Sequence, residues 1–437
     1  MECRASLSND HGPSNVGLWR RRARLRRRVR RVAVAIALVL IAGWIAVENI
    51  GVARFLPAPA SSLTQIASSD AWPTSRGGPL RAGHALTSKP IGQMVVWDVD
   101  LQSPPAGAPI IANGVVLIGS TDGLIHALSL SDGTELWASD LQTRISSTAS
   151  YAGGFVFVGL LDGHVVAMDA TTGDIVWRFK AGQAIRSSPT VVDGVLYVGS
   201  SDRRLYALDA ATGNIRWSFA TGGRITSDPS VNERQVIVIS QDNLVYFVDR
   251  TTAKLKFDYE ISLTNGSAAL AGDSVFVVDV NGTIRRIHWE KRVLPFEKGI
   301  RSVRRWMFRW GMTDKLPPQK GVVWVVQDPT VSFEGTPAVD RFTIYISTSK
   351  GQLLALERET GNELWRATVG ASALTSPIIA GAHIFVGDES GYLSAVSSST
   401  GEVVWQVSTG HMVSESIAVG DGTMVVANDA GRVLAFR

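Results

Sequence analysis

Residues that could carry out chemistry are few in this chain of 437 residues, and they are scattered. The seven histidines show no metal-ligand spacing, and no nucleophile–base pair or phosphate-cradling glycine loop stands out. Cys3 is the single cysteine, so the sequence contains neither a disulfide pair nor the Cys-x-x-Cys-His motif of covalent haem. The sequence therefore predicts no catalytic, cofactor-binding or metal-binding residue.

The elements that must position any functional residue come from an internal repeat of 40 residues. Each period holds four short β-branched or apolar runs separated by turn residues, most clearly around Leu196–Trp217. Four short antiparallel strands per roughly 40 residues are typical of a propeller blade. The clearest marker of the repeat is an aromatic residue, found at Trp97, Trp137, Trp177, Trp217, Phe257, Trp324, Trp365 and Trp405.

Counting the repeats predicts an all-β, eight-bladed β-propeller. Seven repeats end at the markers from Trp137 to Trp405, and an eighth has three strands before the last residue, Arg437. A fourth strand for it is available at 93–99, which carries Trp97 at the marker position. We therefore expect the N-terminal strand to close the ring and leave no open sheet edge.

The marker aromatics are interpreted as structural, because a residue repeated once per blade does the same thing in every blade. We expect each ring to be buried between adjacent blades. The connections that precede the inner strands carry Arg144, Arg186 and Arg224, which are candidates for the mouth of the central channel and would attract an anion. A column of serines in the same connections predicts a polar lining of that channel: Ser147, Ser187, Ser227 and Ser267.

The string Ala-x-Asp-x-x-Thr-Gly-x-x-x-Trp, present at Ala167–Trp177 and Ala207–Trp217, resembles the tryptophan-docking repeat of pyrroloquinoline-quinone-like propellers. The stretch that opens with Trp72-Pro-Thr-Ser-Arg-Gly-Gly resembles the usual start of such domains, so the resemblance covers 72–437. It implies the propeller fold. For function it implies either a quinoprotein dehydrogenase or a protein scaffold such as the barrel-assembly propeller subunit of outer membranes. A dehydrogenase would imply pyrroloquinoline quinone with calcium, normally beside adjacent cysteines, which are absent from this sequence.

The chain before the propeller is predicted to anchor it in a membrane. Residues 1–31 form a basic tail with nine arginines between Arg20 and Arg31, and the uncharged apolar run 32–47 follows. Arginines beside such a run are kept on the cytoplasmic side, so 32–53 is predicted to be a transmembrane signal anchor and 54–71 a linker. A small-residue site at Ala58-Pro-Ala60 leaves a cleaved signal open.

The one break in the period predicts a basic insertion at 290–320, which carries nine Lys or Arg and three acidic residues. Its apolar residues recur at helical spacing from Ile300 to Trp310. Three interpretations stay open: a hairpin folded back on the acidic propeller, a partner-docking helix, or an interfacial helix on the membrane. The candidates for partner docking are Arg301, Arg304, Arg305, Trp306, Arg309 and Trp310.

Together these features predict a single-pass protein of the cytoplasmic membrane with its propeller on the periplasmic or extracellular side. We expect a non-catalytic interaction or assembly scaffold for other membrane or envelope proteins, with no cofactor. Nucleic acid is not an expected partner, because the arginine run abuts an apolar segment. The alternatives are a quinoprotein-like oxidoreductase that uses pyrroloquinoline quinone and a small-ligand-binding propeller.

Overall fold

The computed structural model describes residues 72–85, 92–288, 303, 306, 307, 310 and 321–437, all within a compact unit, Leu56–Arg437. The predicted tail, anchor and linker (1–31, 32–53 and 54–71) lie outside the described residues, as does most of the 290–320 insertion. No helix in the described part of the chain is long and apolar enough to cross a membrane.

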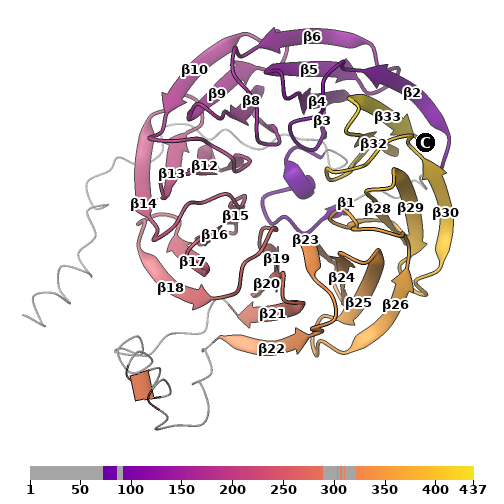
Figure 1. The fold of residues 1–437 in the computed structure, drawn as a ribbon. Coiled ribbons are helices and arrows are strands. Elements are labelled where there is room, and N and C mark those ends of the chain that lie inside the picture. Colours follow the sequence, from indigo (N-terminus) through magenta and orange to yellow (C-terminus); the bar gives the residue numbers. More distant parts are fainter. Residues whose placement is uncertain (1–71, 86–91, 289–302, 304–305, 308–309, 311–320) are drawn as a thin grey trace, which may run out of the picture. The chain divides into compact units, whose positions relative to one another are not determined.

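The described chain forms eight antiparallel sheets arranged in a ring (Figure 1), which confirms the predicted all-β, eight-bladed propeller. The inner strands are β3 (Ile110–Ala112), β7 (Ser150–Ala152), β11 (Thr190–Val192), β15 (Ser230–Val231), β19 (Ala269–Ala271), β23 (Phe333–Val339), β27 (Ile378–Ala380) and β31 (Ala418–Gly420). The second strands are β4 (Val115–Gly119), β8 (Phe155–Gly159), β12 (Val195–Gly199), β16 (Gln235–Ser240), β20 (Ser274–Asp279), β24 (Thr343–Thr348), β28 (His383–Gly387) and β32 (Thr423–Ala427).

The third strands are β5 (Leu124–Ser129), β9 (His164–Asp169), β13 (Arg204–Asp209), β17 (Leu244–Asp249), β21 (Thr283–His288), β25 (Gln352–Glu357), β29 (Tyr392–Ser397) and β33 (Arg432–Phe436). The outer strands are β6 (Glu135–Asp140), β10 (Ile175–Lys180), β14 (Ile215–Ala220), β18 (Leu255–Glu260), β22 (Val322–Gln327), β26 (Glu363–Thr368), β30 (Val403–Ser408) and β2 (Val95–Asp100). We number the blades 1 to 8 in the order of their inner strands.

The ring is closed by the N-terminal strand. β2 pairs antiparallel with β33, the last strand of the chain, and supplies the outer strand of blade 8. In the pairing register Trp97 lies opposite Ala435. Each blade therefore has four antiparallel strands, to which blade 7 adds the short parallel strand β1 (His84–Ala85), and no blade is left with an unpaired third strand.

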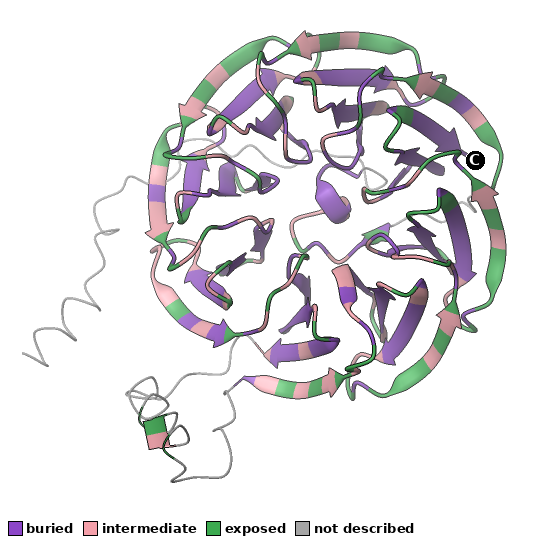
Figure 2. Ribbon diagram, viewed as in Figure 1, coloured by how far each residue is buried: buried purple, intermediate pink, exposed green. Residues whose placement is uncertain are grey.

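The core lies between neighbouring blades. The second and third strands are almost entirely buried, whereas the outer strands alternate between exposed and partly buried residues (Figure 2). This pattern arises because both faces of the middle strands pack on adjacent sheets, while one face of each outer strand meets solvent.

The marker tryptophans lie between adjacent blades. The Trp177 indole N–H donates to the carbonyl of Ala210 in the next blade, at 3.0 Å. Its ring covers Gly213, where φ is +74° and an added Cβ would lie 2.7 Å from the indole. Glycine is required there both for the left-handed backbone and for the close approach of the ring. Equivalent indole-to-carbonyl bonds are made by Trp97, Trp137, Trp217, Trp324 and Trp365.

Two marker residues, Phe257 and Trp405, lack the indole-to-carbonyl hydrogen bond described for the other six. Phe257 has no indole donor and stacks on Phe247 instead, with ring centroids 4.0 Å apart. Trp405 packs against the core cluster of blades 7 and 8. The turn that accepts the other indole bonds joins the third and fourth strands of a blade, and blade 8 lacks this turn because its fourth strand is β2.

Four residues of the insertion are described. Val303, Trp306 and Met307 are helical, and the Trp310 amide donates to the Trp306 carbonyl at 3.1 Å. The Trp306 and Trp310 rings have centroids 6.0 Å apart, and both side chains are more than half exposed. The other docking candidates, Arg301, Arg304, Arg305 and Arg309, lie outside the described residues.

Candidate functional site

The centre of the ring is occupied by the chain's own residues Trp72–Ala85, called the channel segment below (Figure 1). It includes a short 3-10 helix, η2 (Ser75–Gly77), and ends in β1 (His84–Ala85), which pairs with β27 of blade 7. Trp72 exchanges two backbone hydrogen bonds with Ile111 of blade 1. Inner-strand amides of five further blades donate to carbonyls of the segment: Tyr151 to Pro73, Val231 to Pro79, Leu270 to Leu80, Val339 to Ala82 and Ile379 to Gly83.

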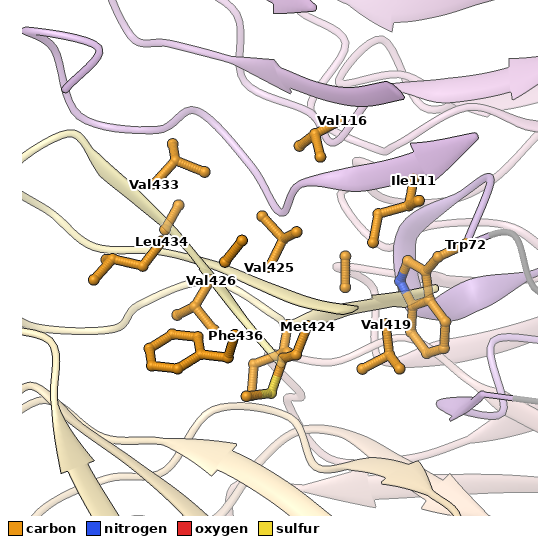
Figure 3. Packing of buried hydrophobic residues seen from close by; sticks show 14 of the residues in the cluster. Trp72, Ile111, Val116, Val419, Met424, Val425, Val426, Val433, Leu434 and Phe436 are labelled. Carbon is orange, nitrogen blue, oxygen red and sulfur yellow. The ribbon is translucent and has the colours of Figure 1, made fainter. Parts of the chain in front are cut away.

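Trp72 fixes the first end of the channel segment. Its side chain is only 1% exposed and packs beside Ile111, Val419 and Met424, so it joins blades 1 and 8 (Figure 3). The sequence identified Trp72 as part of a typical domain start but did not indicate that it lies inside the ring.

Two buried arginines hold the rest of the segment. Arg81 has no exposed side-chain area and pairs with Asp228 through Nη1 at 2.9 Å. It also donates to the carbonyls of Ser75, Ser188 and Pro229 and to the Thr190 hydroxyl. Burial lowers the pKa of the Arg81 guanidinium, while the Asp228 charge opposes that shift.

Arg76 is the second buried cation. It donates to the carbonyl of Pro337, within β23 of blade 6, and to the carbonyl of Pro377, directly before β27 of blade 7. Burial, together with the positive charge of Arg81, lowers the pKa of the Arg76 guanidinium. Arg76 and Arg81 thus attach the channel segment to both sides of the ring.

A polar belt surrounds the channel segment. In six successive pairs of neighbouring blades, from blades 1 and 2 to blades 6 and 7, a backbone amide donates to a side chain at the equivalent position of the next blade, at 2.6 to 3.1 Å. The side chains are hydroxyls except for Asp228 of blade 4. The belt runs through Ala108, Thr148, Ser188, Asp228, Ser267, Thr336 and Ser376.

Of the predicted serine column, Ser147, Ser227 and Ser267 line the central cavity described below, whereas Ser187 does not. Ser147, Ser187 and Ser227 are buried, and each accepts a hydrogen bond at 2.8 Å from a second-strand amide of its own blade. Ser267 instead belongs to the belt. The 40-residue spacing misaligned these residues because the connection before blade 5 is one residue shorter than its equivalent before blade 4.

The belt surrounds a cavity of about 610 Å³, with Ser75 and Arg76 of the channel segment among its lining residues. Serine, threonine, asparagine and glutamine side chains supply most of the remaining lining, and no aromatic side chain contributes. A second cavity of about 300 Å³ shares Glu415 with the first and is also lined by Glu334 and Glu389.

The three predicted mouth arginines do not all line the cavity. Arg186 does, whereas Arg144 and Arg224 lie outside its lining; all three residues are exposed. Arg144 and Arg224 directly precede the buried Ile145 and Ile225, whereas Arg186 directly follows the equivalent Ile185. Arg186 therefore lies two positions later in its connection than the other two arginines.

Glu415 is the main functional candidate that sequence reasoning missed. Burial raises the pKa of its carboxyl, and the nearby Asp228 charge raises it further. No motif marks Glu415, and its neighbour Asp228 is 187 positions earlier in the chain, so only the closed ring brings them together. A signal for Asp228 did exist, because it is the one charged residue in a column of hydroxyls. Among the described residues, no group of three or more histidine, cysteine or acidic side chains could hold a metal.

Comparisons with solved structures reproduce the fold. The crystal structure of BamB from Moraxella catarrhalis superposes with a TM-score of 0.63 at 17% identity, covering 79% of this chain and 97% of that one. Quinohemoprotein alcohol dehydrogenase from Comamonas testosteroni superposes with a TM-score of 0.66 at 16% identity, covering 90% and 83%. The computationally designed Ika8 protein gives 0.62 at 16% identity, covering 79% and 99%. At these identities the likeness shows the fold alone.

Sequence comparison adds the family. No curated protein sequence matched the chain. One family model, described as outer membrane protein assembly factor BamB, matches residues 94–292 and 306–437. The match spans well over half of the chain and is interrupted at 293–305, within the basic insertion. The chain therefore belongs to the BamB family of pyrroloquinoline-quinone-like propellers.

Proposed function

We propose that this protein is a membrane-anchored, exported propeller that acts as a non-catalytic scaffold for other membrane or envelope proteins. The observation that carries the proposal is the family match, because that family is described as an outer membrane protein assembly factor. The central cavity also supports it. Both oxygens of Asp228 are engaged, by Arg81 and by the Ser188 amide, which leaves Glu415 as the one uncommitted carboxylate in the described lining.

That donor set does not fit the calcium-bound quinone implied by the likeness to dehydrogenases. Calcium takes six to eight oxygen ligands and prefers carboxylates. One free carboxylate among hydroxyls and amides, with the buried Arg76 cation in the same lining, is a poor match for a divalent cation. We therefore derive no quinone-dependent step for this chain.

The scaffold proposal assigns partner docking to the basic insertion. The family model aligns on both sides of residues 293–305, so the insertion adds to a shared ring. Two adjacent exposed tryptophans, Trp306 and Trp310, suit the role because large aromatic side chains and arginine dominate interface energies.

The test is native co-purification from membranes solubilised in mild detergent, followed by mass spectrometry. Three forms are compared: the full chain, a variant that lacks 290–320, and a full-length variant with Arg301, Arg304, Arg305 and Arg309 changed to Gln. We expect stoichiometric membrane or envelope proteins with the full chain and their loss with the deletion. Loss in the Gln variant as well would assign the contact to charge. Purification of the full chain alone would contradict the scaffold proposal.

Localisation needs its own measurement. We propose that residues 32–53 span the cytoplasmic membrane with residues 1–31 inside. Carbonate extraction should leave the full chain in the membrane fraction, and protease added outside spheroplasts should reach the propeller. A freely extracted protein, or a propeller protected until lysis, would contradict the anchor and its orientation respectively.

A further inference from the structure

The central cavity contains two opposite charges that do not neutralise each other. Glu415, in the connection to β31 of blade 8, makes no hydrogen bond or ion pair with any residue that the structure describes. Arg186, in the connection to β11 of blade 3, likewise pairs with no described residue. Both side chains line the same cavity of about 610 Å³.

Glu415 is not compensated from the cavity wall. The Asp228 carboxylate repels it and so raises its pKa further, and Asp228 is itself paired with Arg81. Glu415 is half-buried, and a carboxylate that loses part of its hydration is disfavoured unless a partner compensates for the loss. A carboxyl group in this situation, open to a cavity, is matched by a ligand that carries a positive charge.

Arg186 supplies the complementary charge. The residues at the same register in the neighbouring connections are Ser146 and Thr226, which also line the cavity but are neutral. A guanidinium binds a carboxylate through two parallel N–H···O bonds, so Arg186 suits a carboxylate end of a ligand.

The lining between the two charges suits a polar ligand body. Ser188, Thr336 and Ser376 bring hydroxyls, while Gln241, Asn243 and Asn265 bring amides that both donate and accept. The volume lies within the range of about 300–1,000 Å³ typical of small-ligand pockets.

We propose that the central cavity binds a small zwitterion of the amino-acid or short-peptide class. Glu415 pairs with its ammonium group, Arg186 pairs with its carboxylate, and the belt hydroxyls and side-chain amides bond to its peptide groups. This site is separate from partner docking at the insertion, so the two proposals stand or fall on different measurements.

The probe is triglycine, titrated into the detergent-solubilised full chain in an isothermal calorimeter at neutral pH. Two blocked forms each lack one charge: N-acetyl-triglycine has no ammonium, and triglycine amide has no carboxylate. We expect saturable binding of triglycine with a Kd below about 1 mM. Each blocked form should bind at least about tenfold more weakly, the loss expected for one charge-assisted hydrogen bond.

Variants assign each charge to its partner. Glu415→Gln should weaken the binding of triglycine about tenfold and leave the binding of N-acetyl-triglycine unchanged. Arg186→Gln should weaken the binding of triglycine about tenfold and leave the binding of triglycine amide unchanged. The matched controls are Glu389→Gln and Arg224→Gln, which remove like charges outside this lining and should change neither affinity. Neither test side chain has a described partner, so circular dichroism should show folded variants.

Three results would overturn the proposal. These are no saturable binding of triglycine, equal affinity for the free and N-acetylated peptides, or equal effects of Glu415→Gln and Glu389→Gln. None of them depends on whether partner proteins co-purify, so the scaffold proposal would be unaffected.

Discussion

Replacing Arg81 by Met should destabilise the ring more than the loss of any exposed ion pair. Arg81 is fully buried, and its guanidinium joins the channel segment to blades 3 and 4 through Thr190, Asp228 and Pro229. Met fills similar volume but donates no hydrogen bond, so it leaves Asp228 and three buried carbonyls, of Ser75, Ser188 and Pro229, without this donor.

The expected loss in the free energy of unfolding follows from the Asp228 carboxylate that the substitution leaves unpaired. The Asp228 side chain is 19% exposed, so it recovers little hydration after its partner is removed. Breaking a buried ion pair by deleting one member costs about 3–5 kcal/mol. The double variant Arg81→Met, Asp228→Asn removes the unpaired charge and should recover about 1–3 kcal/mol of that loss. A coupling of this kind is what a double-mutant cycle measures.

The assay is urea unfolding of the full chain in detergent, followed by tryptophan fluorescence, with hydrogen exchange measured on peptides that cover 72–85. Arg81→Met should lower the unfolding midpoint and speed exchange of the channel segment first. Arg432→Met is the matched control, since Arg432 pairs with Asp98 across the β2–β33 seam on the surface. Surface pairs contribute little, so its midpoint should hardly move. Equal midpoints for the two variants would refute the reasoning.

Three further outcomes follow from single contacts. Because the pKa of Glu415 is raised in the folded state, its stabilising contribution is complete at acid pH and is lost as the pH rises through that pKa. The stability of Glu415→Gln relative to the native chain should therefore increase as the pH rises above the ordinary carboxyl pKa, in thermal melts. Trp177→Phe should cost about 1 kcal/mol by losing the bond to Ala210, and Trp177→Ala about 3–5 kcal/mol, in urea unfolding. Gly213→Ala should destabilise by at least about 1 kcal/mol, because its Cβ meets the Trp177 ring; an unchanged midpoint would contradict the fit.

The ring was predictable because each of its contacts repeats. The bond from Trp177 to Ala210 and the fit of its ring over Gly213 recur in most blades, so one spacing of 40 residues encodes them all. The closure by β2 was also predictable, because a blade with three strands and a spare strand that carries Trp97 leave one arrangement that buries both.

The centre of the ring was not predictable, because its contacts do not repeat. Arg81 and Asp228 are 147 residues apart and have no counterpart in other blades. The 40-residue period identifies the contacts that the blades share. It gives no information about the channel segment, which occurs once and contacts several blades. The three arginines Arg144, Arg186 and Arg224 were grouped because each lies in a connection before an inner strand, although Arg186 is two positions later in its connection than the other two.

Asp228 contributes both to the stability of the ring and to the electrostatics of the cavity. Removing the positive or the negative charge of the Arg81–Asp228 pair should therefore change ligand binding in opposite directions. Arg81→Met leaves the Asp228 charge uncompensated beside Glu415, so the advantage of free triglycine over its N-acetyl form should grow. Asp228→Asn leaves the Arg81 charge uncompensated, so that advantage should shrink. Both variants should lose stability, whereas the ratio of the triglycine affinity to the N-acetyl-triglycine affinity should rise in Arg81→Met and fall in Asp228→Asn. Changes of the same sign would show that Asp228 acts only as a structural partner of Arg81.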